Sequence, residues 1–282
     1  MDYQGRLRRV QQAMAERDIA VMFFPRAANL FYLAGIRRHL EHGTDHNAYG
    51  DWLSGGYLGQ TGAMRMVVPR MGGGFFIEEA RDKPWIGDVR PILEPVDPAE
   101  VLRETLAGSG VGAGRSRIAV DERSWAQLTI AIRSLFPEAE IVNANEVIAP
   151  MRMIKDDDEL AAMQRASDVA DAVFEAIMPQ LRPGVSELDI SHEIDLQFIR
   201  HGAEYTSFET GVFFNGKRPD SAGQTTRSGG RTLQPGDSVM FDFGGVVDGY
   251  CSDFGRSAFV GEPPADYLRA HEAVIKAQAD AM

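Results

Sequence analysis

Two aspartates near the end of this 282-residue sequence, Asp242 and Asp253, flank a segment that predicts a tight β-hairpin. The signal is Asp248-Gly249, because both residue types tolerate the positive φ angles that a two-residue turn requires. That turn places Asp242 opposite Gly255, and a turn one residue earlier places it opposite Asp253. In either register both carboxylates lie on one face, roughly 4.5–8 Å apart, whereas a three-residue loop puts them on opposite faces unless a bulge corrects the count.

Two carboxylates on one face of a β-hairpin are compatible with only a few kinds of chemistry. Phe241, Phe243 and Phe254 are their neighbours in the sequence, so we expect a partly dry site in which both acids cannot ionise cheaply. A divalent cation would bridge the two groups, and a protonated pair would instead carry out acid–base chemistry without metal. A purely structural alternative has one aspartate capping a turn while the other pairs with Arg256.

The composition excludes several classes of protein. The 41 acidic and 29 basic residues give a formal charge of -12, which argues against a nucleic-acid partner because phosphate binding needs an excess of Lys and Arg. The single cysteine, Cys251, excludes an intrachain disulfide framework and is typical of a reducing compartment. The apolar run Ile19–Phe24 is far shorter than the roughly 20 residues of a membrane span, and no signal-peptide pattern precedes it. We therefore expect a cytoplasmic protein without a membrane partner.

The first half of the sequence alternates between helical and extended patterns, which predicts an α/β domain over residues 1–150. The expected helices are Tyr3–Glu16 and Trp125–Phe136, and the expected strands are Ile19–Phe24, Met64–Pro69, Gly74–Ile77 and Ile118–Asp121. A domain boundary is predicted at Ala149–Glu159, where Pro150 should end a helix. The aspartates at 156–158 are interpreted as caps of the next helix rather than as a metal site.

The second half, residues 151–282, predicts an α+β domain in which helices come first and strands follow. A long helical pattern runs from Leu160 to Leu181, and Ser186 with Asp189 resembles a capping box for a second helix. Short strands are expected at Val212–Phe214, Val239–Phe243 and Ala258–Val260, and a last helix at Asp266–Ala281.

The segment Gly249–Ser257 resembles the first metal-binding hairpin of the creatinase, Xaa-Pro dipeptidase and aminopeptidase P family. That pattern is an Asp eleven residues before a second Asp that stands in Gly-Tyr-x-x-Asp-x-x-Arg-Ser/Thr, and Asp242 and Asp253 match its two acids. Three weaker matches follow the family's order along the chain: Ala28–Gly35, Arg152–Glu159 and Leu233–Asp237.

The resemblance implies a creatinase-like N-terminal α/β domain and a pita-bread α+β catalytic domain. Members of the family hold two divalent metal ions, commonly Mn, Co or Zn, with two Asp, one His and two Glu. Of these five ligands only Asp242 and Asp253 carry over residue by residue. The implied activity is metal-dependent hydrolysis of small peptides before proline, carried out by a homodimer.

Two departures qualify the resemblance. The family's His and Glu ligands lie well downstream of the second Asp, but this sequence ends 29 residues after Asp253 and offers only His271-Glu272 nearby, at an expected surface position. We therefore expect an incomplete catalytic domain. The family's substrate-site His corresponds by count to Thr225, which leaves proline specificity open. The alternatives are a creatinase-like or lyase reaction on a small non-peptide substrate, and a metal-free module that binds peptides or partner subunits.

Substrate contacts are predicted at four residues. Tyr205, Phe208 and Phe214 precede the hairpin and are expected to line its cavity, although aromatic residues in strands are equally good core residues. His46 lies in the His-rich segment 39–46, which is interpreted as a polar loop. In the family, N-terminal loops can reach a neighbouring subunit's active site, so the resemblance implies a substrate contact for His46. No catalytic residue is assigned.

Overall fold

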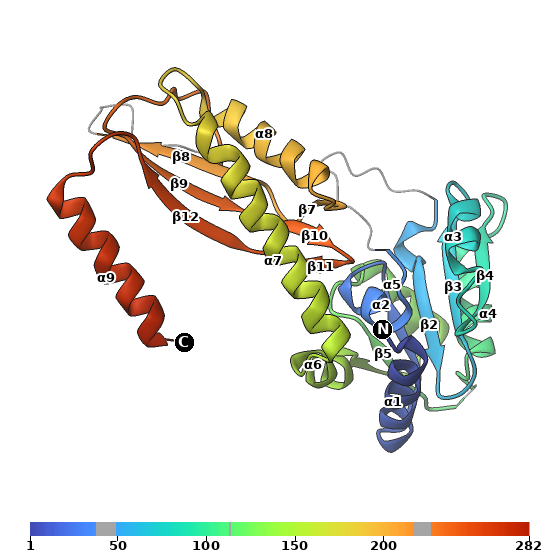
Figure 1. The fold of residues 1–282 in the computed structure, drawn as a ribbon. Coiled ribbons are helices and arrows are strands. Elements are labelled where there is room, and N and C mark those ends of the chain that lie inside the picture. Colours follow the sequence, from blue (N-terminus) through green and yellow to red (C-terminus); the bar gives the residue numbers. More distant parts are fainter. Residues whose placement is uncertain (38–48, 113, 217–226, 282) are drawn as a thin grey trace. The chain divides into compact units, whose positions relative to one another are not determined.

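The computed structural model describes residues 1–37, 49–112, 114–216 and 227–281, which fall into two compact units, residues 1–155 and 156–282 (Figure 1). The first unit contains a six-stranded sheet in the order β4-β3-β2-β1-β5-β6. Its strands are β1 Ile19–Phe24, β2 Gly55–Gly59, β3 Met64–Pro69, β4 Ile86–Ile92, β5 Arg117–Val120 and β6 Glu140–Asn143. The sheet is mixed, because β2 runs antiparallel to both β1 and β3 while the other pairs are parallel.

Helices cover both faces of this sheet. They are α1 Tyr3–Glu16, α2 Ala28–Ala34, α3 Gly73–Ala80, α4 Pro98–Gly108, α5 Ala126–Leu135 and α6 Asn145–Met153, with a short 3-10 turn at Asp51–Leu53. Strand β1 shows the two-sided packing. Met22 and Phe24 belong to the apolar cluster that includes α1 and α2, and Val21 and Phe23 belong to the cluster that includes α4 and α5. A strand buried on both faces needs a continuous apolar run, as its sequence has.

Two predictions for the first unit are wrong. Gly74–Ile77 is not a strand but part of α3, in which Phe76 is buried while Phe75 is 84% exposed. A short apolar run does not distinguish strand from helix, and the helix-forming residues that follow it prevail. Pro150 lies inside α6 rather than ending it. The residue is exposed and the helix ends three residues later, so only one backbone hydrogen bond is lost near a helix end.

The second unit packs two helices on a small antiparallel sheet (Figure 1). The helices are α7 Asp157–Ile177, followed by a 3-10 turn at Met178–Gln180, and α8 Glu187–Arg200. The sheet has the order β12-β9-β8, and a smaller sheet has the order β11-β10-β7. The strands are β7 Tyr205–Thr206, β8 Gly211–Asn215, β9 Ser238–Phe243, β10 Gly245–Val247, β11 Tyr250–Cys251 and β12 Phe254–Phe259.

Both helix starts follow the predicted capping. The Asp156 side chain accepts from the backbone N–H of Glu159, whose own carboxylate accepts from the backbone of Asp156. Ser186 and Asp189 make the same reciprocal pair at α8. Because each pair satisfies free N–H groups of a first turn, it sets where the helix begins.

Among the described residues, the helices α7 and α8 pack on one face of the β12-β9-β8 sheet. Ala166, Ala170 and Val173 of α7 and Ile190, Ile194 and Phe198 of α8 form one apolar cluster with Phe241 and Phe243 of β9. Met240, between those two phenylalanines, is 46% exposed. The last helix, α9 Ala265–Ala281, buries none of its described side chains. No helix in the described ranges is long and apolar enough to cross a bilayer.

Candidate functional site

The hairpin that carries the two aspartates has the predicted turn. Val247 pairs with Tyr250 across Asp248-Gly249, which have φ angles of 50° and 76°, as a type I′ turn requires. Further along the ribbon Asp242 pairs with Gly255. The register predicted for a two-residue turn at Asp248-Gly249 is therefore confirmed.

Asp242 lies on the more exposed face of β9, and Asp253 lies between β11 and β12, outside the paired strands. Phe241, Phe243 and Phe254 are at most 6% exposed and point into the core, while Asp242 is partly exposed and Asp253 is exposed. Asp253 precedes the direct partner of Asp242 by two residues, a diagonal position roughly 7–8 Å away in a regular ladder. The prediction of a partly dry site, which was based on the aromatic neighbours, is wrong. Strand alternation places the three aromatic rings on the face of the ribbon opposite to Asp242.

Two glycines in the middle of the ribbon, Gly244 and Gly245, allow neighbouring groups to approach closely. A Cβ atom on Gly244 would lie 2.1 Å from the carbonyl oxygen of Ser252, and one on Gly245 would lie 2.4 Å from the ring of Phe198. The Ser252 backbone N–H donates to the Gly245 carbonyl at 2.9 Å, and the Gly245 N–H donates to Ser252 Oγ at 3.0 Å. A larger residue at Gly244 would force the chain around Ser252 away, and one at Gly245 would collide with Phe198 of α8.

The tip of the hairpin is anchored to α7 and to the loop before β7. Tyr250 donates its hydroxyl proton to Glu159 at 2.8 Å, and Arg165 forms an ion pair with Asp248 at 2.6 Å. The backbone N–H of Gly249 donates to Glu204 at 2.9 Å. The Gly-Tyr pair of the sequence pattern therefore has a structural role, because it orients the turn rather than contacting the two acids.

Asp242 has a cationic partner that the sequence did not predict. The Arg227 guanidinium donates through Nη2 to Asp242 Oδ2 in a close ion pair. The predicted alternative, Arg256, donates instead to the Gly255 carbonyl at 2.8 Å and lies 4.2 Å from the ring centroid of Phe254. Neither the hydrophobic periodicity of the sequence nor the spacing of the motif indicates a role for Arg227. Only the tertiary structure identifies it as the partner of Asp242.

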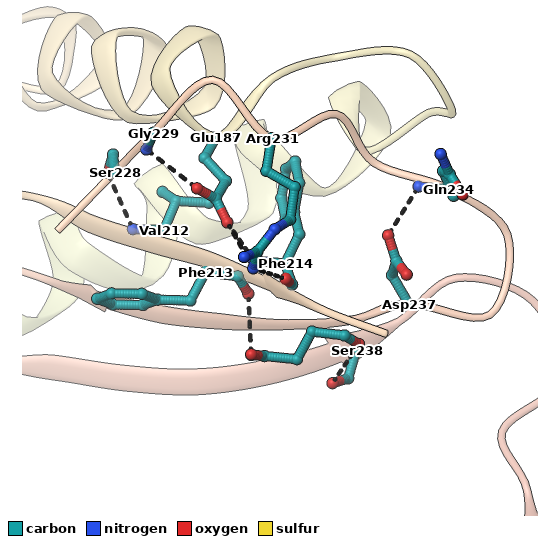
Figure 2. A network of polar contacts seen from close by, with 11 residues as sticks. Glu187, Val212, Phe213, Phe214, Ser228, Gly229, Arg231, Gln234, Asp237 and Ser238 are labelled. Carbon is teal, nitrogen blue, oxygen red and sulfur yellow. Dashed lines mark hydrogen bonds and ion pairs between the residues drawn. The ribbon is translucent and has the colours of Figure 1, made fainter. Parts of the chain in front are cut away.

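A buried network fixes the segment that follows Arg227 (Figure 2). Glu187, at the start of α8, is fully buried and accepts from the backbone N–H groups of Phe214 at 2.7 Å and Gly229 at 3.0 Å. It is also paired with Arg231, at 3.7 Å, and Arg231 donates to the Phe214 carbonyl. These contacts tie residues 229–231 to β8, next to the strand that carries Asp242.

The predicted substrate residues have different surroundings. Tyr205 is half-buried in β7, where it pairs with Val246, and Phe208 is half-buried with the Arg227 guanidinium 5.4 Å from its ring centroid. Phe214 is fully buried in the core beneath α7 and α8, so it is a packing residue and leaves no surface for a substrate. His46 lies outside the described residues.

The other candidates named from the sequence do not form a described cluster with the two acids. His271 and Glu272 are exposed on α9, where the His271 ring lies 6.3 Å from that of Tyr267. Thr225 lies outside the described residues. Within the part of the chain that the structure describes, no group of three or more His, Cys, Asp or Glu side chains could hold a metal ion.

The described donors do not by themselves fit a pair of metal ions. Two carboxylates offer at most four oxygens, whereas hard cations take about six ligands each. One of those oxygens already accepts from Arg227. Asp242 and Asp253 can therefore form only part of such a centre.

Family models match the chain in two consecutive stretches. Residues 6–154 match the Creatinase/Prolidase N-terminal domain, and residues 161–282 match Metallopeptidase family M24. These stretches lie on either side of the division between the two compact units.

Individual relatives agree with these matches. The Xaa-Pro dipeptidase of Lactobacillus helveticus is 32% identical over 212 residues, which are 72% of this chain and 54% of that protein. A dipeptidase from Pyrococcus horikoshii OT3 superposes with a TM-score of 0.78 at 26% identity, over 97% of this chain and 70% of that one. A prolidase from Thermococcus sibiricus has a TM-score of 0.82 at 24% identity and shares the fold over the whole of this chain and 72% of its own. Compared with three curated relatives, the chain spans between 52% and 65% of their length.

Proposed function

Since the chain belongs to the M24 metallopeptidases with a creatinase/prolidase N-terminal domain, we propose that it serves metal-dependent peptide hydrolysis of the Xaa-Pro dipeptidase or aminopeptidase P type. The observation that supports this proposal is the hairpin register, which pairs Asp242 with Gly255, two residues after exposed Asp253.

In this proposal Asp242 and Asp253 are two ligands of a centre for two divalent ions, with Mn, Co or Zn as the candidates. The other ligands lie outside the described residues. The substrate is a small peptide, for which half-buried Tyr205 and Phe208 provide aromatic surface beside the hairpin. The working unit is a homodimer, as the resemblance implies.

The test is metal binding by the 282-residue chain. Elemental analysis after incubation with manganese and gel filtration should find bound manganese in the wild type and none in Asp253→Ala. Asp266→Ala, at an exposed position in α9, is the matched control and should keep the wild-type content. Stoichiometric manganese in a folded Asp253→Ala variant would refute the assignment of this hairpin.

Substrate class is tested separately. With manganese present, an Xaa-Pro dipeptide should be hydrolysed faster than the same dipeptide without proline, and creatine should not be turned over. Turnover of creatine without peptide hydrolysis would instead support a creatinase-like reaction on a small non-peptide substrate.

A second candidate is a metal-free module that binds peptides or partner subunits. The observation in its favour is that the described residues contain no cluster of three ligand side chains, while Arg227 already neutralises Asp242. Peptide binding that persists in EDTA and in Asp253→Ala would select this function. Binding that is lost in both would select the metallopeptidase.

A further inference from the structure

The first unit contains a cavity of about 550 Å³. Its walls are the turn at residues 49–52, the start of α4 at residues 97–99, and part of α5 between residues 127 and 135. All of these described residues belong to the unit 1–155, so the cavity is formed without the hairpin that carries the two acids. Its volume falls in the range of natural small-molecule sites, roughly 300–1,000 Å³.

Two aromatic residues, Tyr49 and Trp52, form one wall of the cavity. Gly50 between them has a φ angle of 74°, and a Cβ atom there would lie 2.8 Å from Ile92 Cδ1, so the turn that presents the two rings requires glycine. The Tyr49 hydroxyl donates to the Val96 carbonyl at 3.0 Å, and Trp52 packs against the apolar cluster that includes α4 and α5. Both rings are therefore positioned by contacts within the protein itself.

Helix α5 supplies another wall. Gln127, Ile130 and Ser134 are spaced by three and four residues, so they lie on one side of the helix. The core-facing residues of α5 are instead Leu128 and Ile132. Ile130 is 68% exposed, so its apolar surface is available to a ligand in the cavity. An apolar residue between two polar ones suits a ligand that has both an apolar body and a polar group.

Asp97 gives the cavity a negative charge. It is the only Asp, Glu, Lys, Arg or His among the described residues that line the cavity. Its Oδ1 accepts from the backbone N–H of Ala99 at 2.9 Å and caps α4, while Oδ2 has no hydrogen bond or ion pair within the described chain. The side chains of Trp52, Gln127 and Ser134 likewise have no hydrogen-bond partner among the described residues. This carboxylate repels an anion, whereas a cation is attracted both to it and to the faces of the aromatic rings.

We propose that this cavity binds a small organic cation in which an ammonium group is carried on an aromatic body. The ammonium group donates to Oδ2 of Asp97, and the aromatic body packs against the rings of Tyr49 and Trp52 and the side chain of Ile130. The charge of the cavity selects the ammonium group, and the aromatic and apolar walls select the body. Because the site lies within the first unit, this inference does not depend on the proposed peptide hydrolysis.

The test uses tryptamine and indolepropionate, two probes that share an indole ring and an ethylene chain but carry opposite charges. Ligand-observed NMR on the 282-residue chain should show that tryptamine binds about tenfold more tightly, because Asp97 attracts the first probe and repels the second. Raising the salt concentration should weaken tryptamine binding, since the carboxylate is exposed to solvent.

Three variants locate the site. Asp97→Asn removes the charge but keeps an N-cap residue of similar strength, so the helix is preserved and tryptamine should bind about fivefold more weakly. Ile130→Gln removes apolar surface at an exposed helix position and should also weaken tryptamine binding, with little change in the melting temperature. Asp88→Asn is the matched control, because Asp88 is an exposed acid on β4 that does not line the cavity, and its affinity should equal that of the wild type.

Three results would overturn the inference: equal binding of the two probes, no binding of either, or unchanged tryptamine affinity in Asp97→Asn. If tryptamine does not bind and sedimentation finds a dimer that Ile130→Gln dissociates, the cavity is an interface between two copies of the chain, and the inference is also wrong.

Discussion

The two units of the chain use their sheets differently. In the first unit the neighbouring strand residues Phe23 and Phe24 point to opposite faces, and each is at most 1% exposed. In the second unit the neighbours Met240 and Phe241 also point to opposite faces, but Phe241 is 1% exposed and Met240 is 46% exposed. One sheet is packed on both sides, whereas within the described part of the second unit the apolar packing comes from the side of α7 and α8.

The polar clusters of the two units differ in the same way. In the first unit Asn29, 6% exposed, donates to Asp121 at 2.6 Å and to Asn145 at 2.9 Å and accepts from Arg152 at 2.7 Å. These hydrogen bonds join α2, α6 and Asp121, the residue that follows β5. Asp242 and Asp253 are instead partly or fully exposed, so they contribute less to packing than the cluster around Asn29 does.

The largest expected effects on stability come from truncating strand side chains to alanine on each face of the two sheets. Phe23→Ala and Phe24→Ala should each reduce the free energy of unfolding of the first unit by about 3–5 kcal/mol, and Phe241→Ala should do the same in the second. Met240→Ala should cost less than about 1 kcal/mol, because little of its apolar area is buried. Hydrogen exchange of the strand amides measures each value. A cost for Met240→Ala as large as for Phe241→Ala would show that this face is covered.

A smaller effect tests whether the second unit depends on the buried network around Glu187. Glu187→Ala leaves Arg231 and two backbone N–H groups without their shared buried acceptor, so the second unit should lose about 3 kcal/mol. Hydrogen exchange should accelerate at residues 229–231 and remain unchanged in the first unit. Glu175→Ala, an exposed position on α7, is the control and should stay within about 0.5 kcal/mol of the wild type. Equal losses in both variants would contradict the role of Glu187.

The smallest expected effects are changes of folding stability with pH, and they should be similar in the two units. The Ser186 hydroxyl and backbone N–H lower the pKa of Asp189 below its ordinary 3.8, and the hydrogen bond from Arg70 lowers the pKa of Glu94 below 4.5. Each group therefore stabilises the folded state above its ordinary pKa, and this contribution disappears as the pH falls through the lower folded value.

The unfolding midpoints of Asp189→Asn and Glu94→Gln should differ from that of the wild type at pH 7 and converge with it as the pH falls through the lowered pKa of each group. In Ser186→Ala the pKa of Asp189, followed by NMR, should return toward its ordinary value. A difference that persists unchanged in acid would contradict the assigned cause.

Much of the secondary structure could be predicted because it depends on local signals. Tyr3–Glu16, Ile19–Phe24 and Met64–Pro69 have the predicted limits, since amphipathic period and a continuous apolar run are properties of the segment itself. The hairpin register followed in the same way from Asp248-Gly249.

Other elements could not be predicted because their neighbours determine them. Strand β2, Gly55–Gly59, is rich in glycine and has little intrinsic preference for a strand, yet it is held between β1 and β3. A Cβ atom on Gly55 would lie 2.2 Å from the Phe24 carbonyl, so the close approach of β1 requires this residue. The sequence shows the glycine but not the strand that approaches it.

By itself, the sequence predicted a tight turn at Asp248-Gly249 and, for a two-residue loop there, the pairing of Asp242 with Gly255, because turn type and strand alternation are local properties of the chain. Only the tertiary structure decided which face of the ribbon is packed and what contacts Asp242. The packing of α7 and α8 directs the phenylalanines inward and leaves the acids outside, and the path of the chain brings Arg227 to Asp242 from fifteen residues away. Both results depend on contacts between distant segments, which no local pattern encodes.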